Sequence, residues 1–321
     1  MIGKKKRRKR GKRKKLSFWK IVGIIMLLFL LLVAGTVGSI YWRLYKDSVD
    51  IVSADDVDPK AKNVKIAQED QKDKDVINVL LVGTDTRDPD SDMGRSDSMM
   101  LVSYNKGKNK ITAVSFLRDS LVEIDGYGKS RLGHTYAYGG VGLTINTLNK
   151  VYGLDIQNYV VISFDNLVNI IDEIGGVTVH ITEEEAEYYR KTGMPDIVSG
   201  SVTLTGSQAL AHSRNRTLGN DFERTRRQRS VMYGIYNKVM SEKNPSTILP
   251  LINYCMNQVS TNMSVTEIYN IAKDVLGTEN LLTQQAGIPQ EGMYTPVVYE
   301  GMQVLEIDLD ASKKLLDQLL Y

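Results

Sequence analysis

The sequence predicts an α/β domain in which helices cover both faces of a buried sheet, preceded by one transmembrane helix. From residue 76 onward, short runs rich in valine, isoleucine and leucine alternate with segments whose apolar residues recur at helical spacing. The short runs are apolar at almost every position, which is typical of strands that are covered on both faces. Ahead of this pattern lies one long apolar run without charges, which predicts the membrane helix.

Composition excludes several classes of protein. Of the 41 Lys and Arg residues, 12 fall within the first 20 positions, where there is no acidic residue, so the rest of the chain has 29 basic and 38 acidic residues. A generally basic nucleic-acid-binding surface is therefore not expected on the folded part. The single cysteine, Cys255, excludes an intramolecular disulfide framework and a cysteine-based zinc site. The 3 histidines are scattered and have no metal-ligand spacing.

The N-terminal segment has the features of a membrane anchor. Residues 4–15 are basic at every position except Gly11, a run that alone would also fit a nuclear or nucleic-acid-binding tail. Residues 21–42 are uncharged and apolar, about the roughly 20 residues needed to cross a bilayer. The charge bias places the N-terminus in the cytoplasm and the rest outside the cell membrane. A cleaved signal peptide is the alternative, but its apolar core is only about 7–15 residues long, so we predict an uncleaved, single-pass anchor.

The chain divides into five predicted segments. Residues 1–20 form a basic cytoplasmic tail, 21–42 the membrane helix, and 43–75 a charged extracytoplasmic stalk with few large apolar residues. Residues 76–242 form the α/β core, and 243–321 contribute helices and a strand that complete the same domain.

Each element of the core has a local signal. Strands are predicted at 77–83, 98–104, 111–116, 158–163, 176–181 and 301–310, from their continuous apolar or alternating patterns. Helices are predicted at 139–152, 165–174, 221–239, 264–276 and 311–320. Gly153 and Gly175 end the first two helices, and Asp165 is the expected N-cap of the second. Ser264 and Glu267 have the spacing of a capping box.

Carboxylates follow or precede the first strands. Asp85 lies just after the first strand and Asp97 at the start of the second, so pairing of these strands brings both to one end of the sheet. Two carboxylates at one site suit Mg²⁺, or Mn²⁺ in its place, together with phosphate oxygens and water. The alternative is that both only cap loops. Arg118 and Asp119 end the third strand and reach the same edge if that strand is parallel to the first.

Arginines dominate residues 206–230, which contain six of them and not one lysine. Arginine is favoured where a planar fork grips a phosphate or carboxylate. Arg224 and Gln228 share a helical stripe with Met232 and Tyr236, so these polar groups face inward and need partners. A solvated basic helix face is the alternative. Asp221, at the start of the helix, either caps it or orients a guanidinium group.

Residues 124–140 are predicted to be a loop that can close over a ligand, with Lys129 and Arg131 among glycines and tyrosines. His134 in this loop is a candidate general base, although a lone histidine is more often simply hydrogen-bonded. Arginines opposite two carboxylates and a cation form the arrangement that phosphoryl transfer requires, because positioning and charge neutralisation supply most of its catalysis.

These motifs together resemble the LytR-CpsA-Psr family of bacterial cell-envelope enzymes. The matching stretches are NVLLVGTD, GRSDS, the RD of FLRDS, TYAYGG, IIDEIGG, and the R-x-R and D-x-x-R-x-x-x-Q patterns carried by Arg214, Arg216, Asp221, Arg224 and Gln228. The resemblance covers about residues 76–240. It implies a three-layer α/β/α sandwich with a mixed central sheet. It also implies Mg²⁺-assisted transfer of a teichoic acid or capsule-like glycopolymer from a polyprenyl-pyrophosphate lipid carrier to a peptidoglycan acceptor.

The resemblance also implies roles for individual residues. Metal binding falls on Asp85 and Asp97, and the catalytic set is Asp97, Arg118, Asp119 and Arg224. The pyrophosphate-binding set is Arg87, Arg95, Arg118, Arg131, Arg214, Arg216, Asp221, Arg224 and Gln228. This chain departs from the family at two places. Residues 131–134 are Arg-Leu-Gly-His, whereas the family frequently has Lys-Ile-Asn-Ala there. Before Arg214, Ser213 or His212 stands where the family frequently has a tyrosine.

Two other functions fit parts of the sequence. A membrane-bound transcriptional attenuator would use the basic tail or the arginine helix to bind DNA, but the predicted topology places that helix outside the cell and the folded part is acidic. We therefore expect no nucleic-acid partner. A hydrolase that cleaves lipid pyrophosphates without transferring the glycan would use almost the same residues, so the sequence does not separate transfer from hydrolysis.

Overall fold

A computed structural model describes residues 65–67, 71–85, 96–241 and 245–321, all within one compact unit that spans 49–321. The basic tail, the membrane helix and most of the stalk predicted above lie outside the described residues, as do Arg87 and Arg95. Among the helices of the described ranges, none has the length and apolar character needed to span a bilayer.

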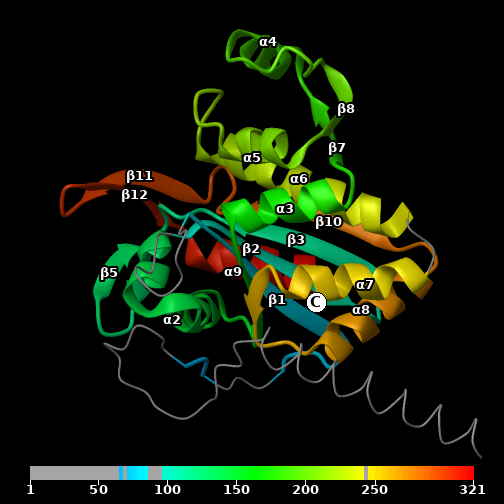
Figure 1. Cartoon of the computed structure of the whole chain (residues 1–321). Coiled ribbons are helices and arrows are strands. Elements are labelled where there is room, and N and C mark those ends of the chain that lie inside the picture. The colour runs from blue at the N-terminus through cyan, green and yellow to red at the C-terminus, as the bar shows by residue number, and fades with distance from the viewer. Residues whose placement is uncertain (1–64, 68–70, 86–95, 242–244) are drawn as a thin grey trace, which may run out of the picture. The chain divides into compact units, whose positions relative to one another are not determined.

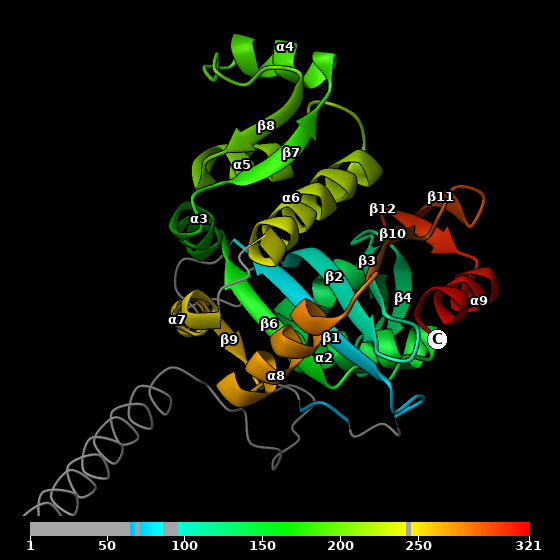
Figure 2. The same cartoon turned by 90° about the vertical axis from the view of Figure 1, so that its right-hand side faces the viewer.

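A six-stranded mixed sheet forms the centre of the fold, in the order β10-β3-β2-β1-β6-β9 (Figures 1 and 2). Its strands are β1 (Val76–Thr84), β2 (Ser96–Asn105), β3 (Lys110–Phe116), β6 (Asn158–Ser163), β9 (Val259–Thr261) and β10 (Leu282–Ile288). The pairs β1–β6 and β3–β10 are parallel, whereas β1–β2, β2–β3 and β6–β9 are antiparallel. The predicted mixed sheet is therefore confirmed, and the C-terminal part of the chain supplies both of its edge strands.

One face of the sheet is densely packed. The helices α2 (Thr135–Tyr152) and α9 (Leu309–Leu320) cover it, and Leu80, Val114 and Phe116 join their apolar side chains in the largest buried cluster. Gly153 follows α2 with φ 65°, the left-handed conformation that makes glycine the usual residue at a helix end. Burial of this cluster supplies the main hydrophobic stabilisation of the domain.

The opposite face is covered less completely. The helices α3 (Phe164–Glu173), α6 (Asp221–Ser241), α7 (Pro245–Met256) and α8 (Val265–Gly277) lie along it (Figures 1 and 2). Successive side chains of a strand point to opposite faces. On β1 the side chains that face α2 and α9 are buried, whereas Ile77, Val79 and Leu81 on the other face are only half-buried. The capping box of Ser264 and Glu267 at the start of α8 is confirmed.

A separate lobe projects from the helix side of the sheet (Figure 1). It contains β7 (Val177–Ile181), α4 (Glu183–Lys191), β8 (Gly200–Leu204) and α5 (Gly206–Arg214), around a second apolar cluster that includes Val179 and Tyr189. The strand predicted at 176–181 is present but lies outside the central sheet, since it pairs with β8 alone. Its side chains alternate between buried and exposed, the pattern of a sheet covered on one face.

Two further expectations need correction. The predicted loop at 124–140 is largely ordered into a hairpin of β4 (Leu121–Ile124) and β5 (Gly128–Arg131), a short 3-10 turn and the first turns of α2. The N-cap of α3 is Ser163, whose hydroxyl accepts a hydrogen bond from the backbone N–H of Asn166, rather than Asp165. Asp165 instead lies in the first turn, where a negative charge is also favourable.

Candidate active site

Strand pairing gathers the predicted carboxylates at one edge of the sheet. Thr84 at the end of β1 pairs with Ser96 at the start of β2, so Asp85 and Asp97 lie at the same edge of the sheet. Because β2 is antiparallel to both β1 and β3, β3 runs in the direction of β1 and delivers Arg118 to that edge as well. The convergence expected from the strand ends is confirmed.

A cavity of about 380 Å³ opens at this edge, lined by Asp85, Asp97, Arg118, Phe164, Arg214, Arg216, Arg224 and Gln228. Seven of these eight residues are predicted from the sequence, and only Phe164 is not. The guanidinium carbon of Arg214 lies 4.4 Å from the centre of the Phe164 ring, a cation–π contact that holds the arginine over the cavity. Phe164 directly follows β6, and its place at the end of a parallel strand is the signal that could have identified it.

Arg224 is the most deeply buried cation of the cavity, with 2% of its surface exposed. Its Nη2 forms an ion pair with Asp221 Oδ1 at 2.7 Å, but its Nε and Nη1 have no hydrogen-bond partner among the described residues. Burial lowers the pKa of Arg224, and Asp221 opposes this shift. A buried donor without a partner costs about 1–3 kcal/mol, and more when it is charged. The two donors on Arg224 therefore need an acceptor, which a bound anion can supply.

Arg118 stands at the centre of a charge network. Its Nη1 donates to Asp97 Oδ1 at 3.2 Å, and its Nε lies 3.8 Å from Asp119 Oδ2 and 3.9 Å from Asp221 Oδ1. Arg216 Nη2 approaches the same Asp97 oxygen at 3.4 Å. Asp221 therefore orients guanidinium groups, while the N-terminus of α6 is capped by the side chain of Asn220, which accepts from two backbone N–H groups.

The two candidate metal ligands line the same cavity but do not form a complete cage. Asp85 is exposed and Asp97 is largely enclosed, with Gln228 Nε2 3.5 Å from its backbone carbonyl oxygen. Within the described ranges, no three His, Cys, Asp or Glu residues are close enough together to hold a metal ion. Two carboxylates beside an anion site fit a cation such as Mg²⁺, which usually binds through one or two carboxylates, phosphate oxygens and water.

The LytR_cpsA_psr family model matches residues 39–319. The chain belongs to this family. It is 31% identical over 293 residues to the polyisoprenyl-teichoic acid–peptidoglycan teichoic acid transferase TagU of Oceanobacillus iheyensis, covering 88% of each chain. It is 30% identical over 282 residues to the TagU of Bacillus subtilis, covering 87% of this chain and 88% of that one.

Solved structures of LytR_cpsA_psr proteins share the fold. The crystal structure of TagT from B. subtilis aligns with a TM-score of 0.62 and 26% identity, covering 81% of this chain and 96% of that one. A structure of TagT bound to LI-WTA aligns with a TM-score of 0.65 and 25% identity, covering 80% of this chain and 99% of that one. The mixed α/β architecture is thus that of the family.

Arg131 lies beside the main cavity and is not part of its lining. Its Nη2 donates to the backbone carbonyl of Gln303 at 2.7 Å, and its Nε lies 3.4 Å from Asp119 Oδ1. Arg131 and His134 line an adjoining pocket of about 130 Å³, together with Asp97 and Asp119, instead of the main cavity. The Nδ1 of His134 is within hydrogen-bonding distance of Ser130 Oγ, at 2.9 Å.

Arg227 has a role that the sequence did not reveal. It is 2% exposed, and its Nε donates to the buried carboxylate of Glu185 at 2.9 Å. Its Nη1 donates to the backbone carbonyl of Asn215 at 3.1 Å, and its Nη2 donates to that of Leu218. Arg227 therefore holds the segment that carries Arg216, and it belongs to the support of the cavity rather than to its lining.

Proposed function

We propose that this protein transfers an anionic glycopolymer, such as teichoic acid or a capsule-like polysaccharide, from a polyprenyl-pyrophosphate carrier to peptidoglycan. The observation that carries the proposal is the pair of buried donors on Arg224 without a partner in the described part of the chain, in a side chain that lines a cavity with three further arginines. The relatives named as teichoic acid transferases, at 30–31% identity over most of their length, support the same substrate class.

In this proposal the pyrophosphate lies among Arg118, Arg214, Arg216 and Arg224, with the Gln228 amide as a further donor. These groups neutralise charge on the phosphate oxygens as the bond to the polyprenyl phosphate breaks. Donors that are already fixed in place stabilise the transition state without reorganisation. Arg118 is fixed by Asp97, Asp119 and Asp221, and Arg214 by the ring of Phe164.

The same proposal includes a divalent cation. Asp85 and Asp97 would hold Mg²⁺, or Mn²⁺, together with phosphate oxygens, and the ion would add a positive charge beside the pyrophosphate. The hydrocarbon chain of the carrier requires an apolar surface. The half-buried side chains of β1 on the α6 face, such as Val79 and Leu81, are of that kind.

We also propose that the basic tail and the apolar segment 21–42 hold the protein in the cell membrane, with the α/β domain on the outer side. This topology places the cavity where a membrane-bound carrier and the peptidoglycan can both reach it. Accessibility of a cysteine introduced into the α/β domain to a membrane-impermeant thiol reagent on intact cells tests it. Labelling only after cell lysis would contradict it.

The activity is tested with the full chain in detergent micelles and a polyprenyl-pyrophosphate-linked glycopolymer. We expect release of polyprenyl phosphate that requires Mg²⁺ or Mn²⁺ and stops on chelation. A glycan acceptor should then capture the glycopolymer through a phosphodiester.

Release without capture at saturating acceptor would favour the lipid pyrophosphate hydrolase instead. Unchanged activity after exhaustive chelation would remove the cation from the proposal. The variant Asp97→Asn should raise the Mg²⁺ concentration required for half-maximal activity.

A further inference from the structure

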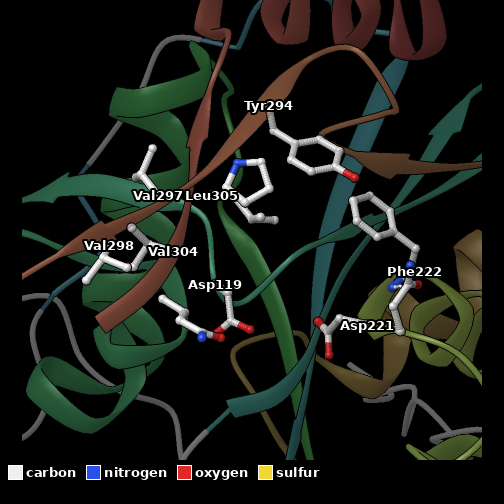
Figure 3. A pocket seen from close by; sticks show the side chains of 11 residues that line it. Asp119, Asp221, Phe222, Tyr294, Val297, Val298, Val304 and Leu305 are labelled. Atoms are coloured by element: carbon white, nitrogen blue, oxygen red, sulfur yellow. Dashed lines mark hydrogen bonds between the residues drawn. The ribbon is translucent and has the colours of Figure 1, made fainter. Parts of the chain in front are cut away.

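A second cavity, of about 560 Å³, lies beside the anion cavity and has different chemistry. It is formed by the hairpin of β11 (Tyr294–Tyr299) and β12 (Met302–Ile307), the start of α6 and the loop after β3. We call it the hairpin cleft and define it by Asp119, Asp221, Phe222, Tyr294, Gln303 and Leu305, which line it with their neighbours (Figure 3). Among the described residues, no arginine lines the hairpin cleft, whereas four line the anion cavity.

The hairpin cleft combines an aromatic wall with polar groups. The rings of Phe222 and Tyr294 face one another with centroids 5.1 Å apart (Figure 3). The pairing of β11 with β12 places Tyr294, Pro296 and Val298 on one side of the hairpin, and all three line the cleft. Val298 keeps 72% of its surface exposed. Apolar surface beside carboxylate and amide groups matches the apolar face and hydroxyl groups of a hexopyranose ring.

The carboxylates that line the hairpin cleft determine the charge of the ligand that it can bind. Asp119 and Asp221 face it from below (Figure 3), and a phosphate group would be repelled by these carboxylates. Burial raises the pKa of Asp221, with Arg224 opposing the shift, and its Oδ2 has no hydrogen-bond partner among the described residues. A neutral ligand with hydroxyl donors satisfies that oxygen, whereas the anionic carrier belongs in the arginine-lined cavity.

The cleft is connected to the site of phosphoryl transfer. Asp119 lines both the hairpin cleft and the pocket that also contains Asp97, Arg118 and Arg216. The hairpin is fixed against this region, because the backbone N–H of Leu305 donates to the carbonyl of Asp119 at 2.9 Å. Carboxylates thus face the cleft, and the guanidinium groups that they orient face the anion cavity. An acceptor hydroxyl in the cleft would therefore reach a phosphate in the anion cavity from the side of the carboxylates.

We propose that the hairpin cleft binds the acceptor glycan, a chain of neutral hexopyranose units stacked on Tyr294 and Phe222. The proposal rests on the transfer activity proposed above. In the transfer step the acceptor hydroxyl oxygen forms a bond to phosphorus, and the bond from phosphorus to the oxygen of the polyprenyl phosphate breaks. The hydroxyl proton passes to the carboxylate of Asp221, and the polyprenyl phosphate leaves as an anion held by the arginines. In-line displacement requires this arrangement, with the attacking and leaving oxygens on opposite sides.

Binding of a neutral glycan tests the proposal directly. The probe is a tetrasaccharide of β-1,4-linked N-acetylglucosamine, titrated calorimetrically into the full chain in detergent micelles without any lipid carrier. We expect Tyr294→Ala to weaken binding at least tenfold, since stacking on the ring is lost. Tyr299→Ala is the matched control, because Tyr299 is on the same strand but does not line the cleft. Failure of the wild-type chain to bind, or equal affinities of all three proteins, would overturn the proposal.

A second variant tests the hairpin cleft without removing a side chain that packs in the fold. Val298→Arg changes an exposed position, so the fold should tolerate it, and the long side chain fills the cleft. In the transfer assay we expect Val298→Arg and Tyr294→Ala to raise the acceptor KM at least tenfold and to leave the donor KM within twofold. Wild-type acceptor KM values in both variants would refute the hairpin cleft while leaving the transferase intact. Absence of donor cleavage by the wild-type chain would refute the proposed function, and the glycan titration would still decide the cleft.

Discussion

Replacement of Arg224 by methionine should separate activity from stability. The side chain is 2% exposed, and its Nε and Nη1 have no hydrogen-bond partner among the described residues. Each charge-assisted hydrogen bond to a bound phosphate contributes about 1.5–3 kcal/mol, so two of them contribute roughly 3–6 kcal/mol. Because about 1.4 kcal/mol corresponds to a factor of ten in rate, kcat/KM for the lipid donor should fall by about 10²–10⁴-fold.

The free energy of unfolding should hardly change in the same variant. Arg224→Met removes the ion pair with Asp221, at 2.7 Å, but it also removes two buried donors that lack partners, and these effects oppose one another. We expect the free energy of unfolding without ligand to stay within about 1 kcal/mol of the wild-type value. Inorganic pyrophosphate should raise the melting temperature of the wild-type chain and not that of the variant.

The assay is thermal unfolding with and without pyrophosphate, alongside donor turnover. Arg226→Met is the matched control, because Arg226 lies on the same helix but is 46% exposed and pairs with Glu223 at 2.8 Å. It should retain both turnover and stabilisation by pyrophosphate. A loss of more than about 3 kcal/mol in the ligand-free Arg224→Met variant would show that the guanidinium is a structural group. Unchanged stabilisation by pyrophosphate would likewise refute the anion site.

Three further predictions concern the support of the site. Arg227→Lys keeps the charge but cannot make all three of the hydrogen bonds of the guanidinium group, so it should lower the free energy of unfolding by about 3 kcal/mol and raise the donor KM. Burial lowers the pKa of His212 from 6.5 to about 4, so between these pH values the unfolded chain binds a proton that the folded chain does not bind. The free energy of unfolding should therefore fall by about 3 kcal/mol as the pH decreases from 6.5 to 4. His212→Gln should reduce this dependence of stability on pH. A Cβ at Gly206 would lie 2.3 Å from a backbone oxygen of α3, so Gly206→Ala should cost at least about 2 kcal/mol in thermal unfolding, whereas Gly277→Ala, with open space around it, should not.

Much of the site could be predicted because its signals are local. Continuous apolar runs identify β1, β2 and β3, and the order of three adjacent antiparallel strands is enough to bring Asp85, Asp97 and Arg118 to one edge. Helical spacing likewise placed Arg224 and Gln228 on one stripe of α6 and indicated that both face inward. These inferences need only the pleat of a strand and the turn of a helix.

Other features depended on partners that are distant in sequence. Arg224 and Arg227 lie on the same helix and are equally buried, yet one opens onto the cavity and the other pairs with Glu185, 42 residues away. The hairpin cleft depends on contact between Phe222 and Tyr294, which no local pattern indicates. The strand predicted at 176–181 lies outside the central sheet, which its sequence did not indicate, because its apolar residues specify a strand without specifying its neighbour.

The sequence by itself determined the fold class, the family, the strand ends that carry the carboxylates and the arginine-rich helix. The tertiary structure decided which arginine donors lack partners among the described residues, which arginine supports the loop before α6, and that a second cleft adjoins the anion cavity. The physical reason is that periodicity reports only which side of an element is buried. The chemistry of a buried charged group depends on the atoms that contact it, and packing between distant segments of the chain brings those atoms together.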